Sequence, residues 1–423
     1  MRRSLADWLR WQETLNPREI DLGLERIRDV ASRLPIRAPA GAVFTVAGTN
    51  GKGSTVAFLE ALLRAGGYRP GVYTSPHLVR YNERVRVSGT SVQDAQLTEA
   101  FEQIEAAREN VPLTFFEFGT LAAWLITTAE RCDAWVLEVG LGGRLDAVNA
   151  IDPDFSLITT IALDHQDWLG DTIEQIAAEK AGIMRSARPA FYGDQVPPDA
   201  IISRAGELDS PLIRYGRDYA AAVTVTADGS ASWSWRGERV GLSDLPAEVI
   251  ADDAQRRNAA LALAAIEQFD AAILSSDAVG RCLSSALPPG RFQMVARSPQ
   301  WVLDVAHNEQ AAQVLCDRLQ SLDKPGPVTV VIGMLADKQI EAFVAALDVV
   351  VDRWIVAAVD DARAADGAVL VQQIAAITQA PVALADSPAD AFMRAEAETP
   401  PEGLILCCGS FRIVGPAIEW LGL

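Results

Sequence analysis

The residues best suited to chemistry lie in a glycine-rich stretch, GTNGKGST, at residues 48–55. It follows the apolar run VFTVA and precedes the helical pattern TVAFLEALLRA, which predicts a strand, a tight loop and a helix. Backbone N–H groups at such a helix N-terminus bind phosphate, and the loop lysine contacts the terminal phosphates. The alternative is a glycine-rich turn with an incidental lysine. The sequence favours a nucleotide site made by Gly48, Thr49, Asn50, Gly51, Lys52, Gly53 and Ser54.

The loop lacks one expected side chain. Phosphate-binding loops usually carry Ser or Thr directly after the lysine, where the hydroxyl binds magnesium. Here Lys52 is followed by Gly53, and the hydroxyls come only at Ser54 and Thr55. Because magnesium requires a nearly octahedral shell of oxygen ligands, we expect other loops to supply what Gly53 cannot.

Polar residues at the ends of other predicted strands are the candidates. Ser75 ends GVYTS, Glu138 lies late in AWVLEVG, and His165 closes SLITTIALDH. Ligands bind at the carboxyl ends of strands in open parallel sheets. An acid in so apolar a strand is costly to bury unless a cation neutralises it, so Glu138 is the first expected metal ligand. His165 is either a metal or phosphate contact or a structural histidine, and Ser75 is weaker because Ser-Pro also marks ordinary turns.

Lys180 occupies an unusual position. In TIEQIAAEKAGIMR it shares a helical face with Ile173, Ile176, Ala177 and Met184 rather than facing solvent. A buried ammonium pairs with a carboxylate, or its amine loses its proton and is modified. The alternative is an aliphatic stem whose charged end reaches the surface.

Bulk properties limit the function. The chain has 423 residues, 49% of them hydrophobic, which predicts two domains. A formal charge of -19 argues against binding to nucleic acid or to anionic membrane, because both need a basic face. The five cysteines show neither metal-site nor disulfide spacing, and the start MRRSLADWLRWQETL lacks the apolar core of a signal peptide. We expect a cytoplasmic protein.

Short apolar runs alternate with helical patterns, which predicts an α/β fold with a parallel sheet covered by helices. Residues 223–242 instead alternate with period two about Asp228-Gly229 and Arg236-Gly237, which indicates a small antiparallel meander. Helices are expected at 171–184 and 253–269. A Pro/Gly break near Pro288 predicts an N-terminal ATPase domain at 1–287 and a smaller, Rossmann-like α/β domain at 288–423.

Several motifs together resemble one enzyme family. VAGTNGKGST, GVYTSPHLVRYNERVRV, LTFFEFGTLAAW, LEVGLGGRLDAVN, IALDHQDWLG and AAEKAGI look like the bifunctional dihydrofolate synthase/folylpolyglutamate synthases, which belong with the Mur-type ATP-dependent amide ligases. The match covers nearly the whole chain, and glycine after the loop lysine is itself a family trait. The resemblance implies an N-terminal ATP- and pterin-binding domain and a C-terminal glutamate-ligase domain.

The resemblance also implies a metal site. It assigns magnesium coordination to Ser75, Glu138 and His165, and a phosphate contact to Ser54. It further implies that Lys180 is carbamylated, so that the lysine becomes an anion that helps to hold a second magnesium ion.

For the pterin substrate, the resemblance points to Ile20, Asp21, Leu22, Gly23, Thr114, Phe115, Phe116, Glu117, Leu145, Asp146 and Ala147. A flat heteroaromatic ring needs an apolar wall such as Phe116 and an acid such as Asp146 to accept its N–H groups. If LTFFEF is a strand, one of its two neighbouring phenylalanines is core. Two positions depart from the family: Val148 stands where Thr is usual, which removes a hydroxyl, and Gln166 follows His165 where Thr is commoner.

In the second half, the matched positions are Asn258 and Arg291 for nucleotide, with Asp304 on the ATP side. His307 and Ser410 are candidate glutamate contacts. The alternative for Asp304 and His307 is capping of the helix that begins near Asn308.

The expected reaction joins L-glutamate to dihydropteroate, or to reduced folates to give polyglutamates, with ATP as co-substrate and an acyl phosphate intermediate. The family leads us to expect a monomer. The alternatives are a Mur-type cell-wall amino-acid ligase and a switch that binds ATP without ligation. A missing extra N-terminal domain and the LTFFEF and IDLGLERI segments argue against the cell-wall ligase.

Overall fold

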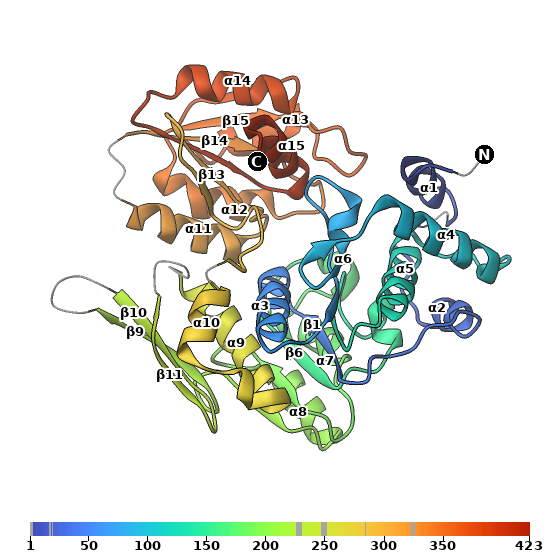
Figure 1. The fold of residues 1–423 in the computed structure, drawn as a ribbon. Helices are drawn as coiled ribbons and strands as arrows, with labels where there is room; N and C mark the ends of the chain where they lie inside the picture. Colours follow the sequence, from blue (N-terminus) through green and yellow to red (C-terminus); the bar gives the residue numbers. More distant parts are fainter. Residues whose placement is uncertain are drawn as a thin grey trace. The chain divides into compact units, whose positions relative to one another are not determined.

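The structure is a computed structural model that describes residues 3–16, 18, 20–225, 231–246, 252–283, 285–322 and 326–423. It divides into two compact units, which Figure 1 traces in colours that follow the sequence. The first unit comprises residues 1–76, 81–162 and 167–287, and the second comprises residues 77–80, 163–166 and 288–423. No helix within the described ranges has the length and apolar character needed to cross a membrane.

The described part of the first unit contains an eight-stranded sheet in the order β4-β3-β2-β5-β1-β6-β7-β8. The strands from β2 to β8 in this order are parallel, while β3 and β4 add an antiparallel edge. Their bounds are β1 (Ala42–Ala47), β2 (Pro70–Tyr73), β3 (Val85–Val87), β4 (Thr90–Ser91), β5 (Ala134–Glu138), β6 (Phe155–Ile158), β7 (Ala190–Tyr192) and β8 (Leu212–Arg214). The central strands β1 and β5 are buried along their whole length, as expected for a sheet covered on both faces.

Each face of this sheet has its own hydrophobic core. Along β1, Val43 and Ala47 pack into one core, and Phe44 and Val46 pack into the other. The first core is covered by α1 (Leu5–Gln12), α2 (Glu25–Ala31), α4 (Asp94–Arg108), α5 (Phe115–Ala129), α7 (Ile173–Ala181) and α8 (Asp199–Glu207). The second is covered by α3 (Lys52–Ala65), α9 (Asp253–Asp270) and α10 (Ser276–Leu283).

The predicted antiparallel meander is confirmed. It consists of β9 (Ala220–Val225), β10 (Ala231–Arg236) and β11 (Gly241–Pro246), which lie beside α9 and α10 in Figure 1. Trp233 and Trp235 of β10 point into the second core. The turn after Arg236 is closed by the Gly237 N–H, which donates to the Val240 carbonyl at 2.9 Å. The turn expected at Asp228-Gly229 lies outside the described residues.

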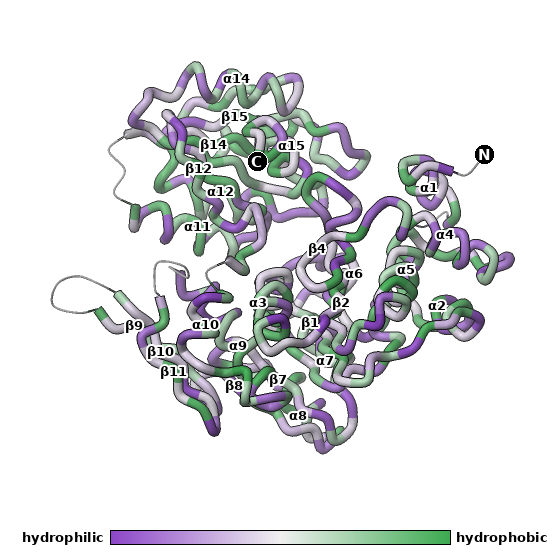
Figure 2. Tube along the Cα trace, in the orientation of Figure 1, coloured by the Kyte–Doolittle hydropathy of each residue, from purple (hydrophilic) through white to green (hydrophobic). Residues whose placement is uncertain are grey.

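The second unit is built on a six-stranded sheet of described residues, in the order β12-β13-β17-β14-β15-β16, with only β12 antiparallel. The strands are β12 (Gln293–Val295), β13 (Gln300–Leu303), β14 (Val328–Ile332), β15 (Arg353–Ala357), β16 (Val382–Ala385) and β17 (Leu404–Cys408). Its helices are α11 (Glu309–Ser321), α12 (Ile340–Leu347), α13 (Gly367–Ala375), α14 (Pro388–Glu398) and α15 (Phe411–Leu421). In Figure 2 the central strand β14 is hydrophobic, whereas the outer helices alternate between hydrophobic and hydrophilic positions.

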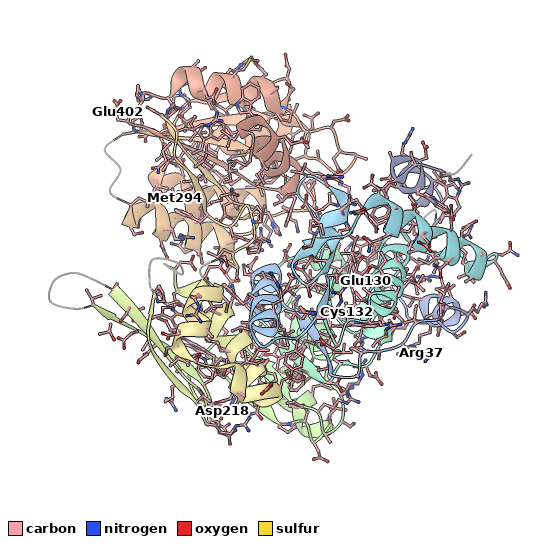
Figure 3. All side chains as sticks on the ribbon, viewed as in Figure 1. Arg37, Glu130, Cys132, Asp218, Met294 and Glu402 are labelled. Carbon is pink, nitrogen blue, oxygen red and sulfur yellow. The ribbon has the colours of Figure 1, made fainter. Side chains whose placement is uncertain are left out.

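Two predicted elements differ from the structure. LTFFEF is not a strand: Thr114 caps helix α5, because its hydroxyl accepts the Glu117 N–H at 3.1 Å and the Glu117 carboxylate accepts the Thr114 N–H at 2.8 Å. Helix α5 ends before Glu130, and the chain then turns through Cys132 into β5; Figure 3 labels both residues. The helix expected at 171–184 is shorter: α7 spans Ile173–Ala181, with Thr172 as its N-cap and Gly182 as its C-cap.

Candidate functional site

The glycine-rich loop connects β1 to α3, as predicted, and the segment after β6 supports it. The Thr49 N–H donates to the Thr160 carbonyl at 2.7 Å, and the Asn50 N–H donates to the Thr160 hydroxyl at 3.3 Å. The Thr159 hydroxyl donates to the Asn50 carbonyl at 2.5 Å. The two strands β1 and β6 therefore position the loop at the carboxyl edge of the sheet.

Lys52 and Ser54 occupy the first turn of α3. The Lys52 Nζ donates to the carbonyls of Gly48 at 2.9 Å and Thr49 at 3.1 Å, so the amine lies over the loop. The Ser54 hydroxyl is buried and has no hydrogen-bond partner among the described atoms. An unsatisfied hydroxyl beside helix N–H groups suits contact with a phosphate or its metal ion.

Asn258 of α9 packs directly against the loop. Gly51 has a φ of 87°, a left-handed conformation that favours glycine. A Cβ added at Gly51 would lie 2.3 Å from the Asn258 Oδ1. The structure thus brings Asn258 to the predicted nucleotide loop, although the two lie far apart in the sequence.

We expect Gly51→Ala to weaken ATP binding by about tenfold or more, because alanine disfavours this φ and would displace either the loop or Asn258. Gly67→Ala is the matched control, since Gly67 has a φ of 84° but no atom within 4 Å of an added Cβ. The left-handed backbone should cost both variants roughly 1–2 kcal/mol of unfolding free energy, and Gly51→Ala should lose more because its Cβ also meets Asn258. Urea unfolding and ATP calorimetry measure the two effects. Equal ATP affinity in the two variants would contradict a close fit at Gly51.

Ser75 and Glu138 lie together. Ser75 lies two residues after β2, and Glu138 is the last residue of the neighbouring parallel strand β5. The Ser75 N–H donates to the Glu138 Oε2 at 3.1 Å. Glu138 is only 5% exposed. Among the described residues, no three His, Cys, Asp or Glu side chains gather as a metal-holding group. A metal ion here would therefore also need hydroxyl, water or phosphate oxygens, which magnesium accepts.

His165 does not end a strand, so that prediction is wrong. β6 stops at Ile158, because the next residues bond to the glycine-rich loop instead of to a neighbouring strand. His165 belongs to the second unit, where its Nε2 lies 3.1 Å from the Lys338 Nζ and its Nδ1 lies 3.5 Å from an Asp337 carboxylate oxygen. Burial lowers the pKa of His165 to about 4, so the ring is neutral near pH 7.

Lys180 is buried, with 3% exposure, in the last turn of α7. Ile176, Ala177 and Met184 are buried with it, but Ile173 is exposed. The alternative in which the charged end of Lys180 reaches solvent is therefore wrong. Pairing with carboxylates and covalent modification remain as the two interpretations.

The three segments expected to bind the acceptor converge in the first unit. The Gly23 N–H donates to the Leu145 carbonyl at 3.2 Å, which joins the first segment to the third. Arg26 of α2 lies 2.9 Å from an Asp21 carboxylate oxygen and 3.3 Å from a Glu117 carboxylate oxygen, which joins the first segment to the second.

Asp146 is the buried acid of this group. Its two carboxylate oxygens accept the N–H groups of Leu141 at 2.8 Å and Val148 at 3.0 Å. Burial raises the pKa of Asp146 to about 7. A carboxylate has about four acceptor positions, so capacity remains for a ligand.

Phe115 and Phe116 are both half-buried, so neither is a fully enclosed core side chain. The Phe116 ring lies over the backbone just after β5, where a Cβ added at Gly140 would come within 2.7 Å of it. The Phe115 ring packs on Tyr81, with ring centroids 5.7 Å apart. Phe116 is thus the ring placed near the carboxyl end of β5.

In the second unit, the predicted residues follow the strands β13 and β17. Asp304 is buried, and its carboxylate accepts the N–H groups of Phe292 at 2.7 Å and Ala306 at 2.8 Å. Burial raises the pKa of Asp304, and the Arg291 charge opposes that shift. The Ser410 hydroxyl donates to the Gly333 carbonyl at 2.6 Å. Helix α11 is capped by Asn308 itself, so Asp304 and His307 are not its N-cap.

Asp164 and Lys338, which were not predicted from the sequence, lie at the centre of an ionic cluster in the second unit. The Lys338 Nζ lies 2.7 Å from the Asp164 Oδ1, and the His307 Nε2 lies 3.5 Å from the Asp164 Oδ2. Burial opposes ionisation, but the contacts with His307, His165 and Lys338 hold the pKa of Asp164 well below its usual range. The available signal was an acid directly before His165 and a lysine in the loop after β14.

Comparisons with known proteins identify the family. Models of the Mur ligase middle domain and the Mur ligase glutamate ligase domain match residues 46–265 and 290–411. A dihydrofolate synthase/folylpolyglutamate synthase of Escherichia coli K12 is 44% identical over 98% of this chain and 95% of its own length. This chain belongs to the dihydrofolate synthase/folylpolyglutamate synthase family. The Haemophilus influenzae member of the family is 36% identical over 88% of this chain and 86% of its own length.

Solved structures of the dihydrofolate synthase/folylpolyglutamate synthase family share the fold. E. coli FolC in complex with DHPP and ADP matches 99% of this chain and 98% of its own chain at 43% identity, with a TM-score of 0.92. A bifunctional folylpolyglutamate synthase/dihydrofolate synthase with Mn, AMPPNP and L-glutamate bound matches 100% of this chain and 98% of its own at 40% identity, with a TM-score of 0.90.

One of the two departures from the dihydrofolate synthase/folylpolyglutamate synthase pattern is explained by the structure. Val148 is fully buried and contributes its backbone N–H, not a side chain, to Asp146. Loss of the usual hydroxyl therefore leaves this contact in place. Gln166, the other departure, accepts a hydrogen bond from Gln339 in the second unit.

Proposed function

We propose that this chain is an ATP-dependent amide ligase that adds L-glutamate to dihydropteroate, giving dihydrofolate, and to reduced folates, giving polyglutamates. The observation that carries this proposal is the convergence of residues 20–23, 114–117 and 145–147 in a unit that also holds the glycine-rich loop. Full-length similarity to ligases of this family supports it.

ATP would be bound mainly by the loop. In the first unit, the contacts would be Gly48, Thr49, Asn50, Gly51, Lys52, Gly53, Ser54 and Asn258. Arg291 and Asp304 stay nucleotide contacts that are predicted from the sequence alone. The left-handed Gly51 at the start of α3 and the Lys52 amine over the loop support this assignment, because a helix N-terminus with a cation beside it attracts phosphate.

The acceptor would lie against the converging segments, which contribute Ile20, Asp21, Leu22, Gly23, Thr114, Phe115, Phe116, Glu117, Leu145, Asp146 and Ala147. Phe116 supplies an apolar wall and Asp146 accepts ring N–H groups. Glu117 acts differently from the other acids, because its carboxylate already caps α5 and contacts Arg26. L-Glutamate would be bound by His307 and Ser410.

The residues present fit a divalent metal. Glu138 is a buried carboxylate joined to the Ser75 backbone, and Lys180 is a buried amine that carbamylation would turn into an anion. In the first unit, Ser75, Glu138 and carbamylated Lys180 would hold two magnesium ions. His165 stays a metal ligand that is predicted from the sequence alone. When bound, magnesium supplies positive charge that screens the phosphates and polarises the phosphoryl group.

The chain's own groups explain how an unreactive carboxylate could be activated. Two anions meet when the acceptor carboxylate attacks the γ-phosphate of ATP, so Lys52 and the loop N–H groups stabilise the charge that redistributes in that step. The product is an acyl phosphate and ADP. The deprotonated α-amine of L-glutamate then attacks the acyl carbon, and phosphate leaves as the amide forms. Exclusion of water protects the acyl phosphate from hydrolysis.

Asp146 predicts how acceptor binding depends on pH. Its ionised form accepts the pterin N–H groups, so the affinity for dihydropteroate should rise with pH and level off above about 7. Below that pH it should fall about tenfold per unit. Equilibrium dialysis without ATP measures this directly. Asp146→Asn should bind weakly at every pH, and a variant that kept the wild-type pH profile would contradict the assignment.

We further propose a cytoplasmic, monomeric enzyme that binds small molecules and neither nucleic acid nor membrane. The net charge of -19 supports the last two points, because the phosphates of nucleic acids and lipids would be repelled.

Phosphate release with a panel of acceptors tests the function. We expect release to require ATP, L-glutamate and either dihydropteroate or tetrahydrofolate, and not to occur with a UDP-sugar peptide. Phosphate release that occurs with the UDP-sugar peptide but with neither pterin acceptor would favour a cell-wall ligase. Phosphate release at the same rate with and without any acceptor would favour an ATP-binding switch.

A further inference from the structure

Arg26 lies between two segments of the proposed acceptor site but belongs to neither. It is on α2, directly after the segment 20–23, and its side chain is 24% exposed. Its guanidinium donates to the Asp21 carbonyl and lies 2.9 Å from an Asp21 carboxylate oxygen. On its other side it lies 3.3 Å from a carboxylate oxygen of Glu117.

The two carboxylates that Arg26 contacts have different surroundings. The Glu117 side chain is only 4% exposed, and burial raises the pKa of Glu117 while the capping bond from Thr114 and the Arg26 charge oppose that shift. Asp21 is more exposed and has two further contacts, an amide hydrogen bond from Asn16 at 3.3 Å and an ion pair with Arg18 at 3.7 Å. Without Arg26, the buried Glu117 carboxylate would lose its arginine partner, whereas Asp21 would keep its pair with Arg18.

The contacts of Glu117 set the position of a whole helix end. The same carboxylate that meets Arg26 accepts the Thr114 N–H at 2.8 Å, so Arg26 is connected to the first turn of α5, from which Phe115 and Phe116 project. The segment containing Asp21 is in turn connected to Leu145 through Gly23. Arg26 therefore closes a chain of contacts through all three acceptor segments.

We propose that Arg26 is a positioning residue for acceptor binding: its guanidinium fixes the distance between the segment 20–23 and the first turn of α5. This inference rests on the proposed function. Arginine suits the role because its planar group donates in several fixed directions at once, to one carbonyl and two carboxylates. Lysine offers a single charged centre and cannot reproduce that geometry.

Arg26→Gln tests the proposal, with Arg33→Gln as the matched control. Arg33 lies just after α2. Its guanidinium is 2.6 Å from an Asp29 carboxylate oxygen, and neither residue belongs to the three acceptor segments. We expect Arg26→Gln to raise KM for dihydropteroate, and its Kd measured without ATP, by about 10–100-fold. The kcat and the KM values for ATP and L-glutamate should change less than about threefold. Arg26→Lys should recover part of the acceptor affinity, and Arg33→Gln should match the wild type.

A second variant and the wild-type assay cover the cases in which Arg26→Gln does not fold or the enzyme does not ligate. If Arg26→Gln fails to fold, it is combined with Glu117→Gln, which removes the uncompensated buried charge while keeping an acceptor for the Thr114 N–H. The double variant should then bind the acceptor more weakly than Glu117→Gln alone. An acceptor KM unchanged in a folded variant, or equal losses for all three substrates, would overturn the proposal. If the wild type shows no acceptor-dependent ligation, the proposed function is refuted. The Kd values of wild type and Arg26→Gln for dihydropteroate, measured without ATP, would still test the role of Arg26.

Discussion

Glu138→Gln is expected to lower kcat by about 10²–10⁴-fold, because it removes several kcal/mol of charge interaction with the proposed metal. Glutamine keeps the size of the side chain and an oxygen that accepts the Ser75 N–H, so the fold should be retained. Steady-state turnover over a range of magnesium concentrations, with circular dichroism as the test of folding, measures both effects.

Glu130→Gln is the matched control for this substitution. Glu130 pairs with Arg69 at 2.7 Å, and its side chain is 34% exposed at the end of α5, where Figure 3 labels it. Surface pairs contribute at most about 1 kcal/mol, so turnover should stay within about twofold. A Glu138→Gln enzyme with near-normal kcat at ordinary magnesium would remove Glu138 from the metal site.

Lys180→Ala is expected to lose roughly 10²-fold in activity and to regain part of it when short carboxylic acids are added. Alanine opens a buried space that formate or acetate can enter, and their carboxylate replaces the proposed carbamate. Activity should therefore rise with the concentration of the acid and reach a plateau.

Glu179→Gln is the control for Lys180, because Glu179 is the neighbouring residue and forms a partly exposed pair with Arg144 at 2.7 Å. It should stay near wild-type activity and show no response to carboxylic acids. If Lys180→Ala were fully active, the lysine would be structural. If added amines rescued the variant and acids did not, Lys180 would act as a cation and not as a carbamate.

The sequence predicts elements well where local patterns settle them. The loop that begins at Gly48, the helix from Asp253 and the alternating meander all have periodicity or turn residues that few other structures satisfy. The segment LTFFEF was misread because its apolar residues are equally compatible with a strand. Its capping pair, Thr114 and Glu117, lies at the spacing of a helix start and was the signal that favoured α5.

The rest of the site depends on contacts between distant segments. Nothing near Gly51 in the sequence indicates that Asn258 packs against it, and nothing near Glu117 indicates Arg26. His165 shows the same limit, because β6 ends early in order to support the glycine-rich loop through Thr160, a contact made only in the folded chain. Residue types gave the chemistry of the site, whereas the partners of each group required the structure.

The fate of oxygen in the acceptor carboxylate tests the central claim most directly. Dihydropteroate labelled with ¹⁸O in its carboxylate is incubated with the enzyme, ATP and L-glutamate, and the released phosphate is analysed by mass spectrometry. Activation through an acyl phosphate predicts that each phosphate carries one ¹⁸O atom for each amide formed. Amide formation with unlabelled phosphate would contradict the mechanism.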